Sequence, residues 1–288
     1  MTPTPLLGTM RLGAWGAGLA PAAVADLIEA ALDAGIDTLD LADIYGDHTT
    51  NALVGAAFAA RPGLRARCRL VAKVGIVMPQ SPGNTRGVQW YDLSPAHLAR
   101  ALEGTLRDLG TDHVEMLMLH RQDPCLDAAA VAAWMQAEQA RGTVGAFGVS
   151  NFDADAMGLF DGRIVVAAHQ LELSLAHSVA LTDGTHAASV RRGAEVQAWS
   201  PLGGGGLLDG TSPAGARLAG PLRAMAAEFD TDPASLLLRW VASVPGTRVV
   251  LGTARAERLR DAAAACAAPL PRDAWFALWE AARGHPAP

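Results

Sequence analysis

Short apolar runs alternate with longer amphipathic stretches along the whole chain. The runs are rich in valine, isoleucine and leucine and do not alternate strictly with polar residues, which is typical of strands buried on both faces of a parallel sheet. The expected strands are Leu6–Met10, Thr38–Ala42, Leu70–Val74, Glu115–Leu119, Ala146–Val149, Val166–Leu171, Val196–Trp199 and Val249–Leu251.

Apolar residues at helical spacing fill most of the stretches between these runs. Ser94 is placed to cap a helix that ends before Gly110, and the sequence around Asp232 and Pro233 is typical of a helix start. The expected helices are Pro21–Ala34, Ser94–Leu109, Leu126–Arg141, Asp153–Phe160, Pro221–Phe229 and Pro233–Val244.

Eight strands with intervening helices in 288 residues predict an α/β protein, a (β/α)8 TIM barrel that forms a single domain over residues 1–288. The main alternative is a doubly wound sheet, which carries a G-x-G-x-x-G loop after its first strand when it binds dinucleotides. The glycine run Gly203–Gly206 does not match that spacing, and no linker or internal repeat divides the chain.

Three long stretches follow strands and are expected on the C-terminal face of the barrel, where barrel enzymes build their sites. They are Gly75–Leu93, Ser174–Gly193 and Gly203–Gly220. Trp15, Trp90 and Tyr91 are the expected walls of a substrate pocket there. For Trp90 and Tyr91 a purely structural role as loop anchors is an equal alternative.

Composition narrows the choice of partners and compartment. The net charge of −6, with interspersed acidic and basic residues, argues against nucleic acid or an anionic membrane as the main partner. The three scattered cysteines form no disulfide framework or metal spacing and favour a reducing cytoplasm. The start of the chain is not typical of a secretory signal, and no apolar run is long enough for a transmembrane helix. We expect a cytoplasmic monomer without a bound metal.

One lysine, Lys73, stands among 22 arginines, which is the most informative count in the composition. A coding bias that favours arginine at every other basic position has left this lysine in place. Lys73 also lies inside an apolar strand pattern, where an idle ammonium is costly. It is therefore predicted to do what arginine cannot, such as titrate, donate as a compact charge or form an imine. Chance survival at a neutral position is the alternative.

Polar side chains follow three successive expected strands at their C-terminal ends. Asp43 and Tyr45 follow the second strand, Lys73 lies near the end of the third, and His120 follows the fourth. These ends converge on one rim of a barrel. An ammonium beside a phenol lowers the pKa of the phenol, so Lys73 is expected to activate Tyr45 as a general acid, with Asp43 as its counter-ion. His120 is expected to orient a substrate carbonyl.

Five motifs together carry a resemblance to a known family. The stretch Asp37–Gly46 resembles the D-T-A-x-x-Y-G signature of the aldo-keto reductases, and four further segments match that family in order and spacing. These segments are Leu70–Lys73, Leu117–His120, Gly145–Phe152 and Ala198–Leu202. The resemblance runs from about Gly8 to Asp261 and is nearest to a bacterial subgroup of predicted oxidoreductases.

The resemblance implies NADPH-linked reduction of aldehydes or ketones on a TIM barrel, with NADH as an alternative cofactor. It carries the catalytic tetrad onto Asp43, Tyr45, Lys73 and His120, with Tyr45 as proton donor. The cofactor-binding positions it implies are Thr9, Met10, Asp43, Ser150, Asn151, Gln170, Trp199, Ser200, Pro201, Leu202, Gly203, Gly252, Thr253, Arg255, Arg258 and Asp261. Among these, Trp199 is implied to stack on the nicotinamide, and Thr253 and Arg258 to grip the 2′-phosphate.

The sequence departs from the family pattern in three places. Gly252 replaces a common lysine on the 2′-phosphate, Ala262 replaces an asparagine that reaches the adenine, and Asn51 replaces a glutamate after the Tyr-Gly loop. The tail after Asp261 is short, so we expect an open substrate pocket without a long C-terminal loop.

Two other functions fit part of this pattern. A Schiff-base aldolase would use Lys73, but it leaves the Ser-Asn, Gln and Trp-Ser-Pro segments without a role. Borohydride trapping of substrate on Lys73 would support it. A regulatory subunit would bind NADPH without turnover of any carbonyl, so an assay with generic aldehydes separates it from an enzyme.

Overall fold

Eight parallel strands close into a barrel in the computed structural model, which describes residues 4–268 and 270–287. In order around the ring the strands are β1 (Leu6–Gly8), β2 (Thr38–Asp40), β3 (Arg69–Val74), β6 (Val114–Leu119), β7 (Val144–Ser150), β8 (Val166–Glu172), β9 (Glu195–Trp199) and β10 (Thr247–Leu251). β10 pairs with β1 and closes the ring. The predicted (β/α)8 barrel is confirmed, and each expected strand overlaps one of these.

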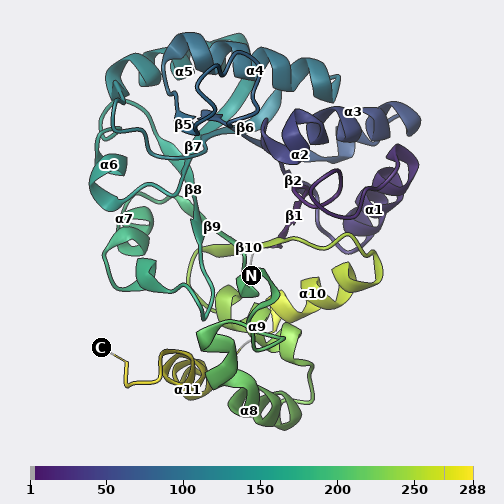
Figure 1. Cartoon of the computed structure of the whole chain (residues 1–288), viewed down its shortest axis with the longest axis vertical. Coiled ribbons are helices and arrows are strands. Elements are labelled where there is room, and N and C mark those ends of the chain that lie inside the picture. Colours follow the sequence, from purple (N-terminus) through teal and green to yellow (C-terminus); the bar gives the residue numbers. More distant parts are fainter. Residues whose placement is uncertain (1–3, 269, 288) are drawn as a thin grey trace.

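Helices surround the ring of strands on its outside (Figure 1). They are α1 (Pro21–Asp33), α3 (Thr50–Ala60), α4 (Pro95–Leu109), α5 (Ala128–Arg141), α6 (Ala154–Gly158), α7 (Thr185–Arg191), α8 (Pro213–Glu228), α9 (Pro233–Ala242), α10 (Glu257–Ala267) and α11 (Arg272–Arg283), with short 3-10 turns η1 (Arg65–Arg67), η2 (Val179–Leu181) and η3 (Gly203–Gly205). As predicted, the Ser94 hydroxyl caps α4 by accepting the N–H of His97, and Gly110 ends the helix with a φ of 66°.

The long stretches on the C-terminal face contain more regular structure than expected. Residues 75–93 include a two-stranded hairpin of β4 (Ile76–Val77) and β5 (Trp90–Tyr91), and residues 174–193 include η2 and α7. The prediction that a helix starts at Pro221 is wrong, because α8 begins at Pro213. The Ser212 hydroxyl caps it by accepting the N–H of Gly215 at 2.9 Å, and Pro221 lies inside the helix.

Side chains from the barrel strands fill the inside of the barrel in layers. The apolar layer consists of Leu6, Val71, Met118, Ala168 and Val250. Side chains two residues apart on a strand share a face, so Lys73 follows Val71 and Gln170 follows Ala168 toward the C-terminal end. Both are almost fully buried, with exposed fractions of 1% and 2%. The barrel therefore places a polar layer on top of an apolar one.

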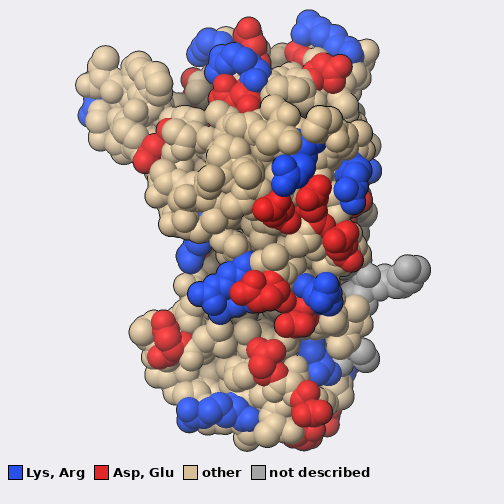
Figure 2. Space-filling model, turned by 90° about the vertical axis from the view of Figure 1, so that its right-hand side faces the viewer, with Lys and Arg blue, Asp and Glu red and all other residues tan. Residues whose placement is uncertain are grey.

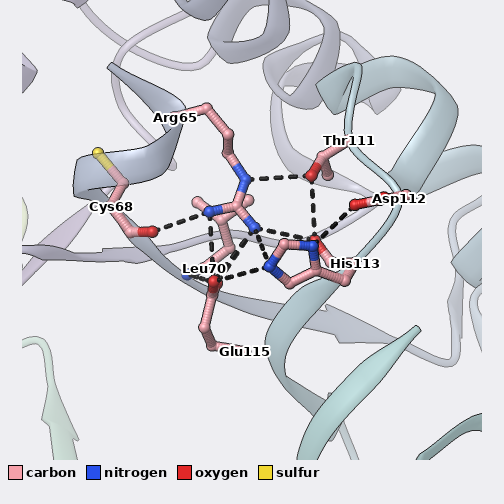
Figure 3. Close-up of polar contacts among 7 residues, drawn as sticks. All are labelled: Arg65, Cys68, Leu70, Thr111, Asp112, His113 and Glu115. Carbon is pink, nitrogen blue, oxygen red and sulfur yellow. Dashed lines mark hydrogen bonds and ion pairs between the residues drawn. The ribbon is translucent and has the colours of Figure 1, made fainter. Parts of the chain in front are cut away.

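A polar network ties β3 to β6 at the opposite, N-terminal end of the barrel (Figure 3). The Arg65 guanidinium pairs with Glu115 at 3.2 Å and donates to the carbonyl oxygen of Cys68 at 2.8 Å. Glu115 also accepts the backbone N–H of Leu70 at 2.6 Å. These contacts lie where both strands begin, far along the strands from Lys73 and His120. The network therefore supports the fold rather than the polar layer.

The C-terminal helix α11 packs against α8, outside the ring of strands (Figure 1). Trp275 of α11 stacks on Trp240 of α9 with ring centres 4.7 Å apart, and each indole N–H donates to the backbone carbonyl of the other residue. Acidic and basic side chains are interspersed over the face drawn in Figure 2. None of the helices in the described residues is long and apolar enough to cross a membrane.

Candidate active site

A buried ion pair is the centre of the polar layer. The ammonium of Lys73, on β3, binds the carboxylate of Asp40, the last residue of β2. The amide nitrogen of Gln170 donates to the same carboxylate at 2.7 Å, and the Thr9 hydroxyl donates to the backbone carbonyl of Asp40 at 2.8 Å. Burial lowers the pKa of Lys73, and the Asp40 charge acts in the opposite direction. A buried ammonium requires such a partner.

The prediction that Asp43 is the counter-ion of Lys73 is therefore wrong, because Asp40 has that contact. β2 ends at Asp40, and beyond it the chain leaves the barrel interior, so Asp43 reaches a different environment. The spacing within the sequence signature already indicated Asp40. In D-T-A-x-x-Y-G the aspartate lies five residues before the tyrosine, which in this chain is Asp40 before Tyr45.

Tyr45 lies beside this pair. The Lys73 nitrogen is 5.2 Å from the centre of the Tyr45 ring, and the His120 ring centre is 6.0 Å from it in an edge-on arrangement. The expected lowering of the phenol pKa by Lys73 is not found: burial raises the pKa of Tyr45 well above 10, and the Asp40 charge adds to the rise. The physical reason is that burial disfavours the phenolate more than the ammonium favours it, since Asp40 offsets part of the Lys73 charge.

His120 is held as a neutral ring. It is 8% exposed, and burial together with the positive charges of Lys73 and Arg121 lowers its pKa well below 6.5. Its Nδ1 atom is buried without a hydrogen-bond partner among the described residues. A neutral imidazole can donate one hydrogen bond to a carbonyl oxygen, as predicted for this residue. The structure thus brings Tyr45, Lys73 and His120 together, with Asp40 as the fourth member.

The backbone after Tyr45 follows an unusual path in the short turn α2 (Tyr45–His48). Three successive residues, Gly46, Asp47 and His48, have φ values of 59°, 55° and 68°, a region that non-glycine residues rarely adopt. The His48 ring holds the turn in place. Its Nδ1 contacts the carbonyl oxygen of Asp43 at 2.9 Å, and its Nε2 contacts the Ser81 hydroxyl at 2.8 Å. Sequence reasoning did not identify His48.

Asp43 lines a cavity of about 530 Å³ between α3, α4 and residues 75–93. Its Oδ1 atom, the Asn51 amide oxygen and the Thr105 hydroxyl are buried there without partners among the described residues. Burial raises the pKa of Asp43 from 3.8 to about 7. Asn51, which stands where the resemblance implies a glutamate, is 3% exposed and lines this cavity.

The raised pKa of Asp43 predicts a pH-dependent stability. A carboxyl whose pKa is raised by folding favours the folded state only while it is protonated. The contribution of Asp43 to the free energy of unfolding is therefore present below about pH 4, decreases between about pH 4 and pH 7, and is lost above about pH 7. Asp43→Asn cannot ionise, so its free energy of unfolding relative to wild type is expected to rise by about 2–4 kcal/mol from pH 4 to pH 8. Urea unfolding at both pH values measures this. Asp33→Asn, on the exposed end of α1, is the control and should show no such change.

The C-terminal ends of β7 and β9 form a second polar group. The Trp199 indole N–H donates to the Asn151 side-chain oxygen at 3.0 Å, and the Asn151 amide nitrogen donates to the Ser150 hydroxyl at 2.7 Å. Asn151 and Ser200 have positive φ values of 55° and 56°. Gln170 connects this region to the ion pair through Asp40. The expected set of Ser150, Asn151, Gln170 and Trp199 is therefore assembled around one end of the barrel.

Glycines and cations follow the last two barrel strands. Gly203, Gly204 and Gly205 have φ values of 58°, 67° and 105°, and side chains at the last two would meet nothing within 4 Å. After β10, Gly252 is equally open. Arg255, just before α10, and Arg258, in its first turn, are both exposed. Neither arginine has an ion pair among the described residues. Thr253, through its hydroxyl, accepts the N–H of Arg255 at 3.2 Å, and Asp261 lies exposed on α10.

The remaining expected site residues lie in several different environments. Trp15 and Tyr91 pack in the apolar cluster around Tyr45, with the Trp15 ring centre 6.2 Å from that of Tyr45. Trp90 instead lines the cavity beside Asp43, because neighbouring residues on a strand face opposite sides. Thr9 is fully buried, and its hydroxyl donates to the backbone carbonyl of Asp40. Of the others, Met10 is 39% exposed, Leu202 is partly buried and Pro201 is buried.

Comparisons with known proteins agree with this geometry. The model of the aldo/keto reductase family matches residues 6–283. A 6-dehydroglucose reductase from Agrobacterium fabrum is 38% identical over 280 residues, which cover 96% of this chain and 93% of the relative.

Two solved structures share the fold. The aldo/keto reductase from Klebsiella pneumoniae in complex with NADP and acetate has a TM-score of 0.80 at 26% identity, over 100% of this chain and 93% of its own. The complex of an aldo-keto reductase from the same organism with NADPH has a TM-score of 0.78 at 26% identity, over 100% and 92%. With the barrel and the motifs at its strand ends, these matches show that the chain is an oxidoreductase of the aldo/keto reductase family.

Proposed function

We propose that this protein reduces an aldehyde or ketone to an alcohol with NADPH, and that Tyr45 supplies the proton. The observation that carries the proposal is the contact of a buried phenol with the Lys73–Asp40 pair and the neutral His120 at one end of the barrel. When bound, NADPH would supply the hydride to the carbonyl carbon. A proton on the oxygen completes the alcohol, and NADP+ is the second product.

The residues of this chain perform the proton chemistry. His120 donates a hydrogen bond to the carbonyl oxygen and orients it toward the Tyr45 hydroxyl. As negative charge develops on that oxygen, the phenol donates its proton, and the Lys73 ammonium stabilises the phenolate that remains. Asp40 keeps Lys73 charged, and Gln170 and Thr9 hold Asp40. Trp15 and Tyr91 cover Tyr45 and limit its contact with water.

The strand ends of β7, β9 and β10 fit the cofactor. Ser150, Asn151 and Gln170 offer the donors and acceptors that a carboxamide needs, and Trp199 offers an aromatic face. The open backbone of Gly204 and Gly205 suits a pyrophosphate. Arg255 and Arg258, with Thr253 beside them at the start of α10, suit the 2′-phosphate.

Arg258 is expected to select NADPH over NADH. Arg258→Ala removes a charge-assisted hydrogen bond to the 2′-phosphate, so it should weaken NADPH binding by about 1.5–3 kcal/mol and leave NADH binding nearly unchanged. Fluorescence titration with both cofactors measures the two dissociation constants. Arg260→Ala, two residues further along α10 and also exposed, is the control. An equal loss for both cofactors would contradict the assignment of the phosphate site to Arg258.

Titration with NADPH followed by a panel of carbonyl compounds tests the whole proposal. The panel includes aliphatic, aromatic and polyhydroxylated aldehydes, since the Agrobacterium relative is named a 6-dehydroglucose reductase. Consumption of NADPH with at least one carbonyl supports the proposal. Tight NADPH binding with no turnover would favour a regulatory subunit, and borohydride trapping on Lys73 would favour an aldolase. A cytoplasmic location is part of the proposal, supported by the free cysteines Cys68, Cys125 and Cys266.

A further inference from the structure

An unpaired guanidinium lies at the C-terminal end of the barrel. Arg121 directly follows His120 after β6 and is half-buried. Its Cζ atom lies 5.8 Å from the centre of the Trp199 ring, so the side chain reaches across the site toward β9. Within residues 4–268 and 270–287, no side chain or backbone group forms an ion pair or hydrogen bond with the guanidinium.

The acidic side chains nearby are engaged elsewhere. The Asp123 carboxylate accepts two backbone N–H groups, at 2.8 and 3.3 Å, and forms no ion pair with Arg121. Asp40 binds Lys73, and Glu172 at the end of β8 lies 3.9 Å from a histidine ring. No acidic side chain in the described part of the chain therefore pairs with the positive charge of Arg121.

This charge acts directly on the reacting groups. The positive charge of Arg121 opposes the rise in the pKa of Tyr45 and contributes to the lowering of the pKa of His120. The ammonium of Lys73 is paired with Asp40, whereas the guanidinium of Arg121 has no acidic partner among the described residues. A half-desolvated cation gains most from an anionic partner, and the planar fork of arginine matches a carboxylate with two parallel hydrogen bonds.

We propose that Arg121 selects the substrate, which is a carbonyl compound that also carries a carboxylate group. The inference rests on the proposed function, since it places the carbonyl at Tyr45 and His120. The guanidinium binds the carboxylate and leaves the carbonyl oxygen within reach of the neighbouring His120. No pocket residue other than Arg121 is needed for this choice between charged and neutral substrates.

The test compares 4-formylbenzoate with its neutral methyl ester, which has the same aldehyde. Wild type and Arg121→Gln are assayed with NADPH at low salt. The ratio of kcat/KM for the acid to that for the ester is expected to fall by about 10- to 100-fold in Arg121→Gln, mainly through KM, the usual range for losing a hydrogen-bonded charge. Arg121→Lys, which keeps the charge and loses the fork, should give an intermediate ratio.

Two controls isolate the substrate contact. Arg223→Gln removes the same charge from the exposed side of α8 and should keep the wild-type ratio. The NADPH dissociation constant should be the same in wild type and Arg121→Gln. An unchanged ratio in Arg121→Gln would overturn the inference, and so would weakened NADPH binding with an unchanged ratio, since Arg121 would then serve the cofactor.

A binding measurement separates this inference from the proposed function. Calorimetric titration with 4-(hydroxymethyl)benzoate, the alcohol product, should show binding to the NADP+ complex of wild type and at least about tenfold weaker binding to Arg121→Gln. If this difference is found but no aldehyde is reduced, the proposed function fails and the anion site is supported. If both aldehydes are reduced with the same ratio in both proteins, the proposed function is supported and the anion site fails.

Discussion

Tyr45→Phe is expected to lower carbonyl reduction by at least about 10²-fold, the usual scale for the loss of a general acid. The substitution removes one oxygen from a buried ring and keeps the ring's packing against Trp15 and His120. NADPH affinity should therefore remain nearly unchanged. The measurement is kcat with the best aldehyde of the panel, together with a fluorescence titration of the cofactor.

The only other tyrosine of the chain provides a matched comparison. Tyr91 lies in the same apolar cluster as Tyr45, and Tyr91→Phe also removes a phenolic hydroxyl while keeping the ring. It should retain most of the wild-type rate, because nothing in the geometry gives its hydroxyl a part in the reaction. Turnover at the wild-type level in Tyr45→Phe would remove the proposed mechanism.

Lys73→Met is expected to abolish most of the activity, and Lys73→Arg to restore little of it. Methionine leaves the buried Asp40 carboxylate without a cation, which also costs about 3–5 kcal/mol of stability. Arginine keeps the charge, but its planar guanidinium does not fit a site built around a compact ammonium with 1% exposure. Steady-state rates and urea unfolding of the same samples measure the two effects.

Substitutions of the two aspartates separate the roles of charge and fold. The double variant Lys73→Met with Asp40→Asn removes both charges, so it should regain stability but not activity. Asp40→Asn alone should reduce the rate strongly, whereas Asp43→Asn leaves the ion pair intact and should have a much smaller effect on it. Full activity in Lys73→Arg would contradict the special role inferred for the single lysine. A larger rate loss in Asp43→Asn than in Asp40→Asn would contradict the assignment of the counter-ion.

The strands were predictable because parallel barrel strands are buried on both sides and leave apolar runs in the sequence. Helix starts were harder to predict. Pro213 and Pro221 carry the same signal for a first turn, and only the contact between Ser212 and Gly215 decides that α8 begins at the earlier one. Helix α7 lies within a stretch that was expected to be a long loop.

In the site, residue types were predictable and side-chain directions less so. Asp40 and Asp43 are three residues apart, and the end of β2 determines which of them faces Lys73. The strand alternation of β2 and the register of the signature both point to Asp40. The pKa of Tyr45 depends on how deeply the phenol is buried and on the charge balance around it, which no local motif specifies. His48 gave no signal, because its contact with Ser81 joins segments 33 residues apart.

The His48 contacts have a consequence for how this enzyme can acquire new specificity. Ser81 and Gln80, which binds Asp47 at 2.5 Å, belong to the segment 75–93 that carries Trp90 and Tyr91. The same segment therefore forms part of the surroundings of the substrate and holds the turn α2, which positions the phenol of Tyr45. Exchanging it for the corresponding segment of a relative, by recombination or by design, alters selectivity and turnover together. A graft intended to change selectivity alone has to preserve a hydrogen-bonding group at position 81.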